Sequence, residues 1–173
     1  MAGHVLSDAS PPIALAQVGG LIWLQRPFGT VRAPPEVLAE AASGRGFAGE
    51  AEVLKDVDQG WLKVTGPASA TPTAPELPEL DEGESACIRC GLSMLSTPGV
   101  GQSSGALILM DERAGRAVAQ EHGLRVAGTA AVIGMAKSRG LIVSAKDVFS
   151  RLHASDFRIS TAVISTVLKR VGE

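Results

Sequence analysis

The amino-acid sequence predicts an α/β protein, a three-layer α/β/α sandwich in which a parallel sheet of about five strands lies between helices, with extra C-terminal helices. Residues 106–110, ALILM, form an apolar run without a polar face, typical of a strand covered on both sides in the middle of a parallel sheet. Short apolar segments also alternate with helical segments, which favours parallel strands joined by crossovers. The 173 residues are 45% hydrophobic, so 1–173 is predicted to be a single domain with a helical appendix at about 144–173.

The first half of the chain is predicted to contain three strands, at residues 4–7, 30–33 and 61–64. Ser10 before Pro11 and Pro12 is typical of a helix N-cap followed by proline in the first turn, and Gly19-Gly20 would end that helix. This gives a helix at 11–18, and further helices are expected at 21–25, 34–41 and 50–57, with a glycine-rich turn at 43–49.

The second half is predicted to begin with a proline-rich loop at 66–78, which a compact domain uses as a lid, a binding loop or a mobile link. Thr129 is expected to cap a helix that Gly140 ends. The remaining strands are expected at 106–110 and 124–127, after a loop of small residues at 96–105. The helices are expected at 81–95, 112–122, 130–137, 145–154 and 160–171.

Composition and charge narrow the possible functions. No apolar run approaches the ~20 residues that span a bilayer, and the first residues lack the pattern of a signal peptide, so we expect a cytoplasmic protein without membrane contact. Residues 1–104 hold 6 basic and 12 acidic side chains, whereas residues 105–173 hold 10 and 6. This asymmetry suits an acidic cation-binding cleft beside a phosphate-attracting surface, but unequal solvated faces would produce it equally well.

Four acids are predicted to gather at one edge of the sheet. Asp8 and Asp111 each follow a predicted strand, and parallel strands all end at the same edge, where α/β proteins place their chemistry. Glu40 lies on a helix that opens just after another strand, and Glu84 lies one turn into the helix before the 106–110 strand. Converging carboxylates could hold Mg²⁺ or Mn²⁺ and so assist the cleavage of a phosphodiester.

Each acid also has an ordinary structural explanation. Asp111 could cap the helix that follows it, and Asp81 with Glu84 matches a capping box. Glu40 could simply be solvated. Asp8 is the least explained by local structure, because Ser10 is expected to supply the cap.

Other chemistries find little support in the sequence. Cys87 and Cys90 have no second ligand pair for zinc and are expected to be small buried residues. The nucleophile elbow GxSxG and the phosphate-binding GxxxxGK[ST] loop are both missing from the sequence. Two Trp, four Phe and no Tyr argue against an aromatic platform for stacking bases.

Five segments carry a family resemblance: VLSDASPPIALAQVG, APPEVLAEAAS, LDEGESACI, LILMDERAGRAVAQEHGLRVAGTAAVIGMAKSRGLI and DFRISTAVISTVLKRVGE. Taken together, they resemble the PIN-domain nucleases, specifically the branch similar to VapC-type toxins, and the match covers nearly the whole chain in order. Two positions depart from the family pattern. Glu112 stands where a second Asp is more usual, and Glu84 replaces an Asp, which lengthens that side chain by one methylene.

The resemblance implies a PIN fold and Mg²⁺- or Mn²⁺-dependent cleavage of RNA, often by a toxin that a small antitoxin neutralises. The family's metal-binding acids correspond to Asp8, Glu40, Glu84 and Asp111. Ser10 resembles the hydroxyl residue that supports the first acid, and Arg113 and Arg116 resemble a basic pair that approaches the phosphate backbone. Lys137 is a further candidate for backbone contact, and a homodimer is expected from the family and the apolar terminal helices.

Two other functions remain open at this stage. A PIN fold could bind RNA or a partner protein without cutting. A phosphatase or receiver-like domain could instead use Asp8 as a nucleophile, but that class needs a Lys or Thr at another strand end, and Thr129 and Lys137 match this role poorly.

Overall fold

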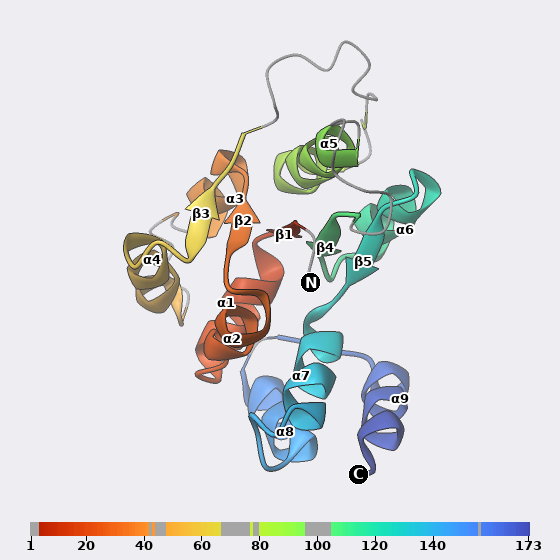
Figure 1. Ribbon diagram of the computed structural model, residues 1–173. Coiled ribbons are helices and arrows are strands. Elements are labelled where there is room, and N and C mark those ends of the chain that lie inside the picture. The colour runs from red at the N-terminus through yellow and green to blue at the C-terminus, as the bar shows by residue number, and fades with distance from the viewer. Residues whose placement is uncertain are drawn as a thin grey trace.

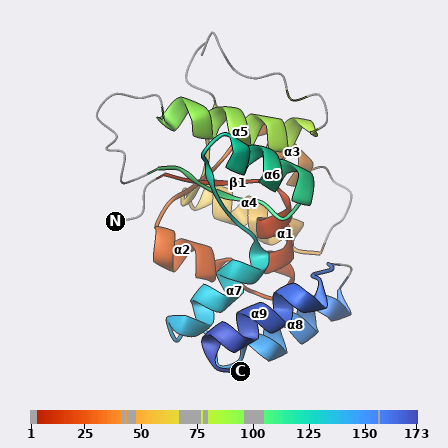
Figure 2. The ribbon, with the colours of Figure 1, turned by 90° about the vertical axis from the view of Figure 1, so that its right-hand side faces the viewer.

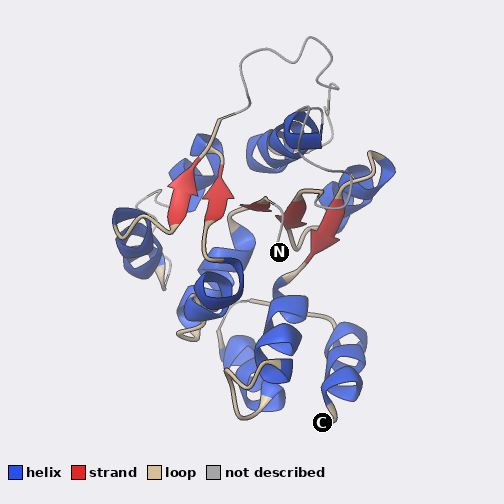
Figure 3. Ribbon diagram, in the orientation of Figure 1, coloured by secondary structure: helices blue, strands red, loops and turns tan. Residues whose placement is uncertain are grey.

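The computed structural model describes residues 4–41, 43, 48–66, 77, 80–95, 105–155 and 157–173. Within them, a five-stranded parallel sheet has the order β3-β2-β1-β4-β5, which confirms the predicted sheet (Figure 3). The strands are β1 (Val5–Ser7), β2 (Val31–Ala33), β3 (Leu62–Val64), β4 (Leu107–Leu109) and β5 (Arg125–Ala127). The apolar run forms β4, which pairs with β1 on one side and β5 on the other. The central position, however, belongs to β1, whose Leu6 lies in register with Ile108.

Helices cover both faces of the sheet, as predicted for a three-layer sandwich. Figures 1 and 2 show α3, α5 and α6 over one face, and α1, α2, α4 and α7 over the other. The two C-terminal helices pack on α7, outside the second layer. The bounds are α1 (Ser10–Gln17), α2 (Ile22–Phe28), α3 (Pro35–Ala41), α4 (Glu50–Asp58), α5 (Glu82–Leu95), α6 (Arg113–Glu121), α7 (Thr129–Ser138), α8 (Ala145–Ala154) and α9 (Thr161–Val171).

The predicted ends of the first two helices are wrong in their details. Ser10 is not the N-cap of α1, because the capping position falls on Ala9 and no side chain caps the helix. The second helix continues past Gln25 and through Pro27. Proline removes a single backbone hydrogen bond there, in the last turn, and Gly29 ends the helix with a φ of 69°. Most of the turn at 43–49 and of the loops at 66–78 and 96–105 lies outside the described residues.

The core joins the sheet to α5 through small and aliphatic side chains. Cys87 and Cys90 are buried and unpaired with each other, as predicted. The Cys87 thiol donates a hydrogen bond to the Ser7 carbonyl, 3.3 Å away, so α5 is joined to the end of β1. Among the described residues, no helix has both the length and the apolar character needed to cross a membrane.

The C-terminal residue connects three helices. The Glu173 carboxylate accepts hydrogen bonds from the backbone N–H groups of Ala145 and Lys146, at the start of α8. It also forms an ion pair with Lys137, at 3.0 Å. These partners hold the pKa of Glu173 at about 2, chiefly through the two backbone hydrogen bonds. The end of α9 is therefore fixed beside α7 and α8.

We predict that Glu173→Gln loosens this connection, because a neutral amide is a weaker acceptor and forms no ion pair. Hydrogen exchange followed by mass spectrometry should show faster exchange at Ala145 and Lys146, with the strands unaffected. Glu121→Gln, an exposed change at the end of α6, is the matched control. Unchanged exchange at the start of α8 would contradict this role for Glu173.

Candidate functional site

The carboxyl ends of β1 and β4 place two of the predicted acids at the same edge of the sheet. Asp8 directly follows β1, and its backbone N–H donates to the Leu109 carbonyl at 2.9 Å. Asp111 lies two residues beyond the end of β4. Because all five strands are parallel, this edge is where α/β folds present their ligand-binding side chains.

Asp8 is a buried carboxylate with an unused oxygen. The residue is 4% exposed, and Oδ1 has no hydrogen-bond partner among the described residues. Burial raises the pKa of Asp8 from 3.8 to about 7, because the charged form loses its water. A hydrogen bond from the Ala9 backbone lowers this pKa, whereas the charges of Asp81, Glu40 and Glu84 raise it. Asp8 therefore lies within a cluster of like charges.

Glu84 has a structural role and an unused oxygen in the same carboxylate. The capping box is formed: the Glu84 N–H donates to Asp81 Oδ1 at 2.8 Å, and the Asp81 N–H donates to Glu84 Oε2 at 3.3 Å. The other oxygen, Oε1, is buried and has no partner within the described part of the chain. Burial is the main cause that raises the pKa of Glu84, and the charges of Asp81, Glu112 and Glu40 add to it. Glu84 can therefore complete the capping box with one oxygen and keep the other available for a ligand.

Two glycines leave space beside the unused oxygens. A Cβ on Gly115 would lie 2.6 Å from Glu84 Oε1, and a Cβ on Gly83 would lie 3.3 Å from Asp8 Oδ1. Gly83 also borders a cavity of about 390 Å³ between α3 and the start of α5. Its lining is acidic and includes Glu36, Glu40, Asp81 and Glu82. The two glycines thus keep side chains away from both oxygens, and Gly83 does so beside an acidic opening that favours cations.

Asp111 is oriented by the start of α7. Its Oδ1 accepts from the Thr129 backbone N–H at 2.8 Å, and its Oδ2 accepts from the Thr129 hydroxyl at 2.6 Å. Burial raises the pKa of Asp111, and the two Thr129 hydrogen bonds and the Arg116 charge lower it. The expectation that Asp111 caps the helix directly after it is wrong, because Glu112 caps α6. Asp111 instead accepts hydrogen bonds from Thr129, the first residue of α7.

The structure brings some predicted site residues together and separates others. Asp8, Glu40 and Glu84 act on one another electrostatically. Arg113 is exposed in the first turn of α6, and Arg116 donates to the Met110 carbonyl at 2.9 Å. Ser10 begins α1 and has no capping role. Lys137 lies in the last turn of α7, ~12 Å along the helix from Thr129, and pairs with Glu173 instead of joining the acids.

Sequence reasoning missed two contributors to the site. Thr129 was expected to be a helix cap, but Gly128 occupies that position and the Thr129 side chain binds Asp111. Asp81 was considered only as half of a capping box, although its charge raises the pKa of both Asp8 and Glu84. The capping-box motif was a usable signal for Asp81, whereas the pairing of Thr129 with Asp111 depends on tertiary structure.

The fold and the site define an α/β protein with a carboxylate cluster at the carboxyl edge of a parallel sheet. A family model described as a PIN domain matches residues 4–173, and the chain belongs to this family. PIN domains are generally metal-dependent nucleases, so the fold is of a nuclease type. A comparison with curated proteins finds no significant match. The likeness to the VapC-type branch therefore stays a prediction.

The residues of the site fit a hard divalent cation. Among the described residues, no group of three His, Cys, Asp or Glu side chains lies close enough to hold a metal ion. Mg²⁺, however, is usually bound by one or two carboxylates, with water and substrate phosphates as its other ligands. Asp8 Oδ1 and Glu84 Oε1 are two such carboxylate oxygens, buried and without partners.

We predict that Asp8→Asn stabilises the metal-free protein at alkaline pH. Because the pKa of Asp8 in the folded protein lies above 3.8, the protonated carboxyl favours the folded state at low pH. This stabilisation is lost as the pH rises through about 7. Asparagine resembles the protonated acid, so the gain at about pH 8 should reach at most ~4 kcal/mol and should nearly vanish at about pH 4. Urea unfolding in EDTA measures this, with Asp58→Asn on α4 as the control. An equal difference at both pH values would contradict it.

Thr129→Val tests how Asp111 is held. The substitution keeps the shape of the side chain but removes the hydroxyl that donates to Oδ2, so the pKa of Asp111 should rise. We expect a loss of roughly 1–2 kcal/mol in unfolding free energy. Nuclear magnetic resonance titration of the carboxyl carbons measures the pKa, and Thr129→Ser should restore it. An unchanged Asp111 titration in Thr129→Val would contradict the assignment.

Proposed function

We propose that the protein is a Mg²⁺- or Mn²⁺-dependent endoribonuclease that cleaves RNA phosphodiesters. The observation that carries this proposal is the pair of unpartnered buried oxygens, Asp8 Oδ1 and Glu84 Oε1, at the active edge of a PIN domain. Two carboxylates that are destabilised by burial and mutual repulsion gain most from a cation that neutralises them.

The side chains around this pair have complementary roles. Asp8 and Glu84 would hold the ion, with Glu40 contributing negative charge and Thr129 keeping Asp111 in place. A divalent ion, when bound, polarises a phosphodiester and lowers the pKa of its water. Arg113 and Arg116, in the first turn of α6, provide positive charge for the phosphate backbone. Catalysis would thus rest on positioning and charge neutralisation.

The biological setting is proposed from the resemblance to VapC-type toxins. In this proposal the protein is a cytoplasmic toxin of a toxin–antitoxin pair, acts as a homodimer, and is held inactive by a small antitoxin. The excess of basic side chains after residue 104 supports RNA as the substrate, because phosphate contacts dominate such binding and make it salt-dependent.

The second candidate is a PIN fold that binds RNA without cutting it. Two observations favour it. Within the described part of the chain no three metal-ligating side chains converge, and both oxygens of Asp111 are engaged by Thr129. Tight RNA binding without cleavage in Mn²⁺ would identify this function.

Glu84→Gln separates the structural role of Glu84 from its proposed metal role. Glutamine serves in a capping box, so α5 should remain stable, but the neutral side chain binds a cation poorly. We expect Mn²⁺-dependent cleavage of labelled RNA to fall by about a hundredfold or more, while the protein stays folded and loses no stability, because burial already disfavours the Glu84 charge. Glu121→Gln removes the same charge at the exposed end of α6 and should cleave like the wild type. Normal cleavage by Glu84→Gln would remove Glu84 from the site.

A further inference from the structure

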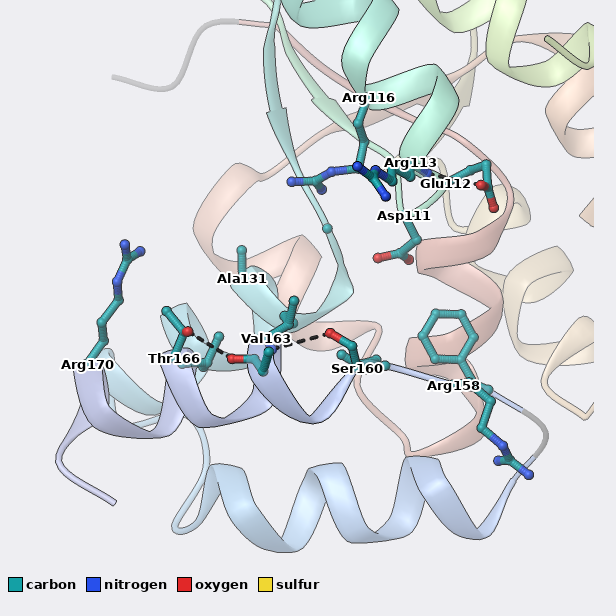
Figure 4. A pocket seen from close by; sticks show the side chains of 16 residues that line it. Asp111, Glu112, Arg113, Arg116, Ala131, Arg158, Ser160, Val163, Thr166 and Arg170 are labelled. Carbon is teal, nitrogen blue, oxygen red and sulfur yellow. Dashed lines mark hydrogen bonds between the residues drawn. The ribbon is translucent and has the colours of Figure 1, made fainter. Parts of the chain in front are cut away.

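A second cavity, of about 810 Å³, lies between the start of α6 and the C-terminal helix α9. Figure 4 shows the Asp111 carboxylate between the two sides, with Arg113 and Arg116 on α6 and the residues of α9 opposite. Asp111 and Glu112 border the cavity, so it reaches two of the acids that follow β4 at the carboxyl edge of the sheet. Its volume lies in the range of small-ligand pockets, ~300–1,000 Å³.

Positive charge is present on both sides of this cavity. Arg113 and Arg116 contribute from α6, and Arg170 contributes from the far end of α9 (Figure 4). Arg158 also borders the cavity, and its guanidinium donates to the His153 and Ser155 carbonyls, as that of Arg116 does to the Met110 carbonyl. The four arginines outnumber the two acids at the border, which favours an anionic ligand.

Between these charges the wall of the cavity is apolar. It includes Ala131 of α7, Val163 and Val167 of α9, and Phe157 and Ile159 of the segment before α9. Val163 is 45% exposed, so this wall is open to a ligand. Close packing of α9 on α7 shapes the wall, because a Cβ on Gly134 would lie 2.8 Å from Val167 Cγ1.

We propose that this cavity binds one unpaired nucleotide of a single-stranded RNA, next to the phosphate at the acid cluster. The base would lie against Val163 and Ala131, with flanking phosphates at Arg113 and Arg116 on one side and at Arg170 on the other. This inference rests on the proposed function and specifies its substrate. The wall is aliphatic with Phe157 as its aromatic member, so it agrees with the shortage of aromatic residues in the sequence.

The combination of an apolar wall with separated cations distinguishes single strands from duplexes. A paired helix presents phosphates but keeps its base faces stacked, whereas a single strand can place an unstacked base in a pocket. An apolar peptide could fill the wall, but it would bring no negative charge to match the arginines. The charge around the cavity therefore favours RNA.

The test measures binding to the full chain in EDTA, so that neither metal nor cleavage is needed. The probes are a fluorescein-labelled ten-nucleotide oligouridine and an RNA duplex of the same length, followed by fluorescence anisotropy. Val163→Trp fills the cavity, and Ser165→Trp adds the same group to α9 outside it. Arg170→Ala removes one lining cation, and Lys169→Ala removes the neighbouring cation, which does not line the cavity.

We expect Val163→Trp to weaken oligouridine binding about tenfold, and duplex binding to be weaker than oligouridine binding in the wild type. Arg170→Ala should reduce the slope of log affinity against log salt by about 0.7, the value for one single-strand phosphate contact. Both controls should stay within about twofold of the wild type. In the wild type, a 4-thiouridine oligonucleotide should cross-link to the peptide that contains residues 157–170.

Any of four results would overturn the proposal. The cavity and control variants could have equal effects, or the protein could prefer the duplex. It could also fail to bind RNA, or cross-link outside residues 157–170. Binding of a leucine- and glutamate-rich peptide in place of RNA would overturn the proposal too and assign the cavity to a protein partner. Cavity-dependent binding without Mn²⁺-dependent cleavage would refute the nuclease and retain the nucleotide site. Mn²⁺-dependent cleavage with RNA binding that does not depend on the cavity would support the nuclease and refute the nucleotide site.

Discussion

The burial of Asp8 among other carboxylates is the constraint on which the rest of the site depends. The carboxylate lies at the end of the central strand, with like charges from Asp81, Glu40 and Glu84 around it. A buried charge without a partner destabilises a fold unless it is neutralised. As far as the described residues show, the chain neutralises Asp8 neither with a basic side chain nor with a hydrogen bond to Oδ1. The cation of the proposed function would supply the positive charge that this carboxylate lacks.

Structural and functional roles are combined in single side chains at this edge. One Glu84 oxygen completes the capping box of α5, while the other remains free for a ligand. Asp111 stabilises the start of α7 and at the same time borders the large cavity. These acids are therefore held rigid by the helices they stabilise, which is what a site that relies on positioning requires.

Local patterns predicted the elements well and their distant contacts poorly. The apolar runs identified all five strands, and the spacing of Asp81 and Glu84 identified their capping box. The bond between Asp111 and Thr129 joins residues 18 positions apart through the pairing of β4 with β5, which no local pattern encodes. Asp8 was assigned to the site because it follows a strand, which the structure confirms, whereas the supporting argument that Ser10 caps α1 is wrong. The burial of Asp8 at the end of the central strand is the stronger argument for placing it in the site.

The C-terminal helices have a larger role than the appendix that the sequence predicted. Gly134 lets α9 approach α7, and Glu173 fixes the end of α9 to Lys137 and the start of α8. This arrangement sets Arg170 and Val163 opposite Arg113 across one cavity. Lys137, which the sequence suggested as a phosphate contact, thus contributes by holding α9 in place. In the proposed nucleotide site, a side chain distant from the acids would thus help to shape the surface that receives the substrate.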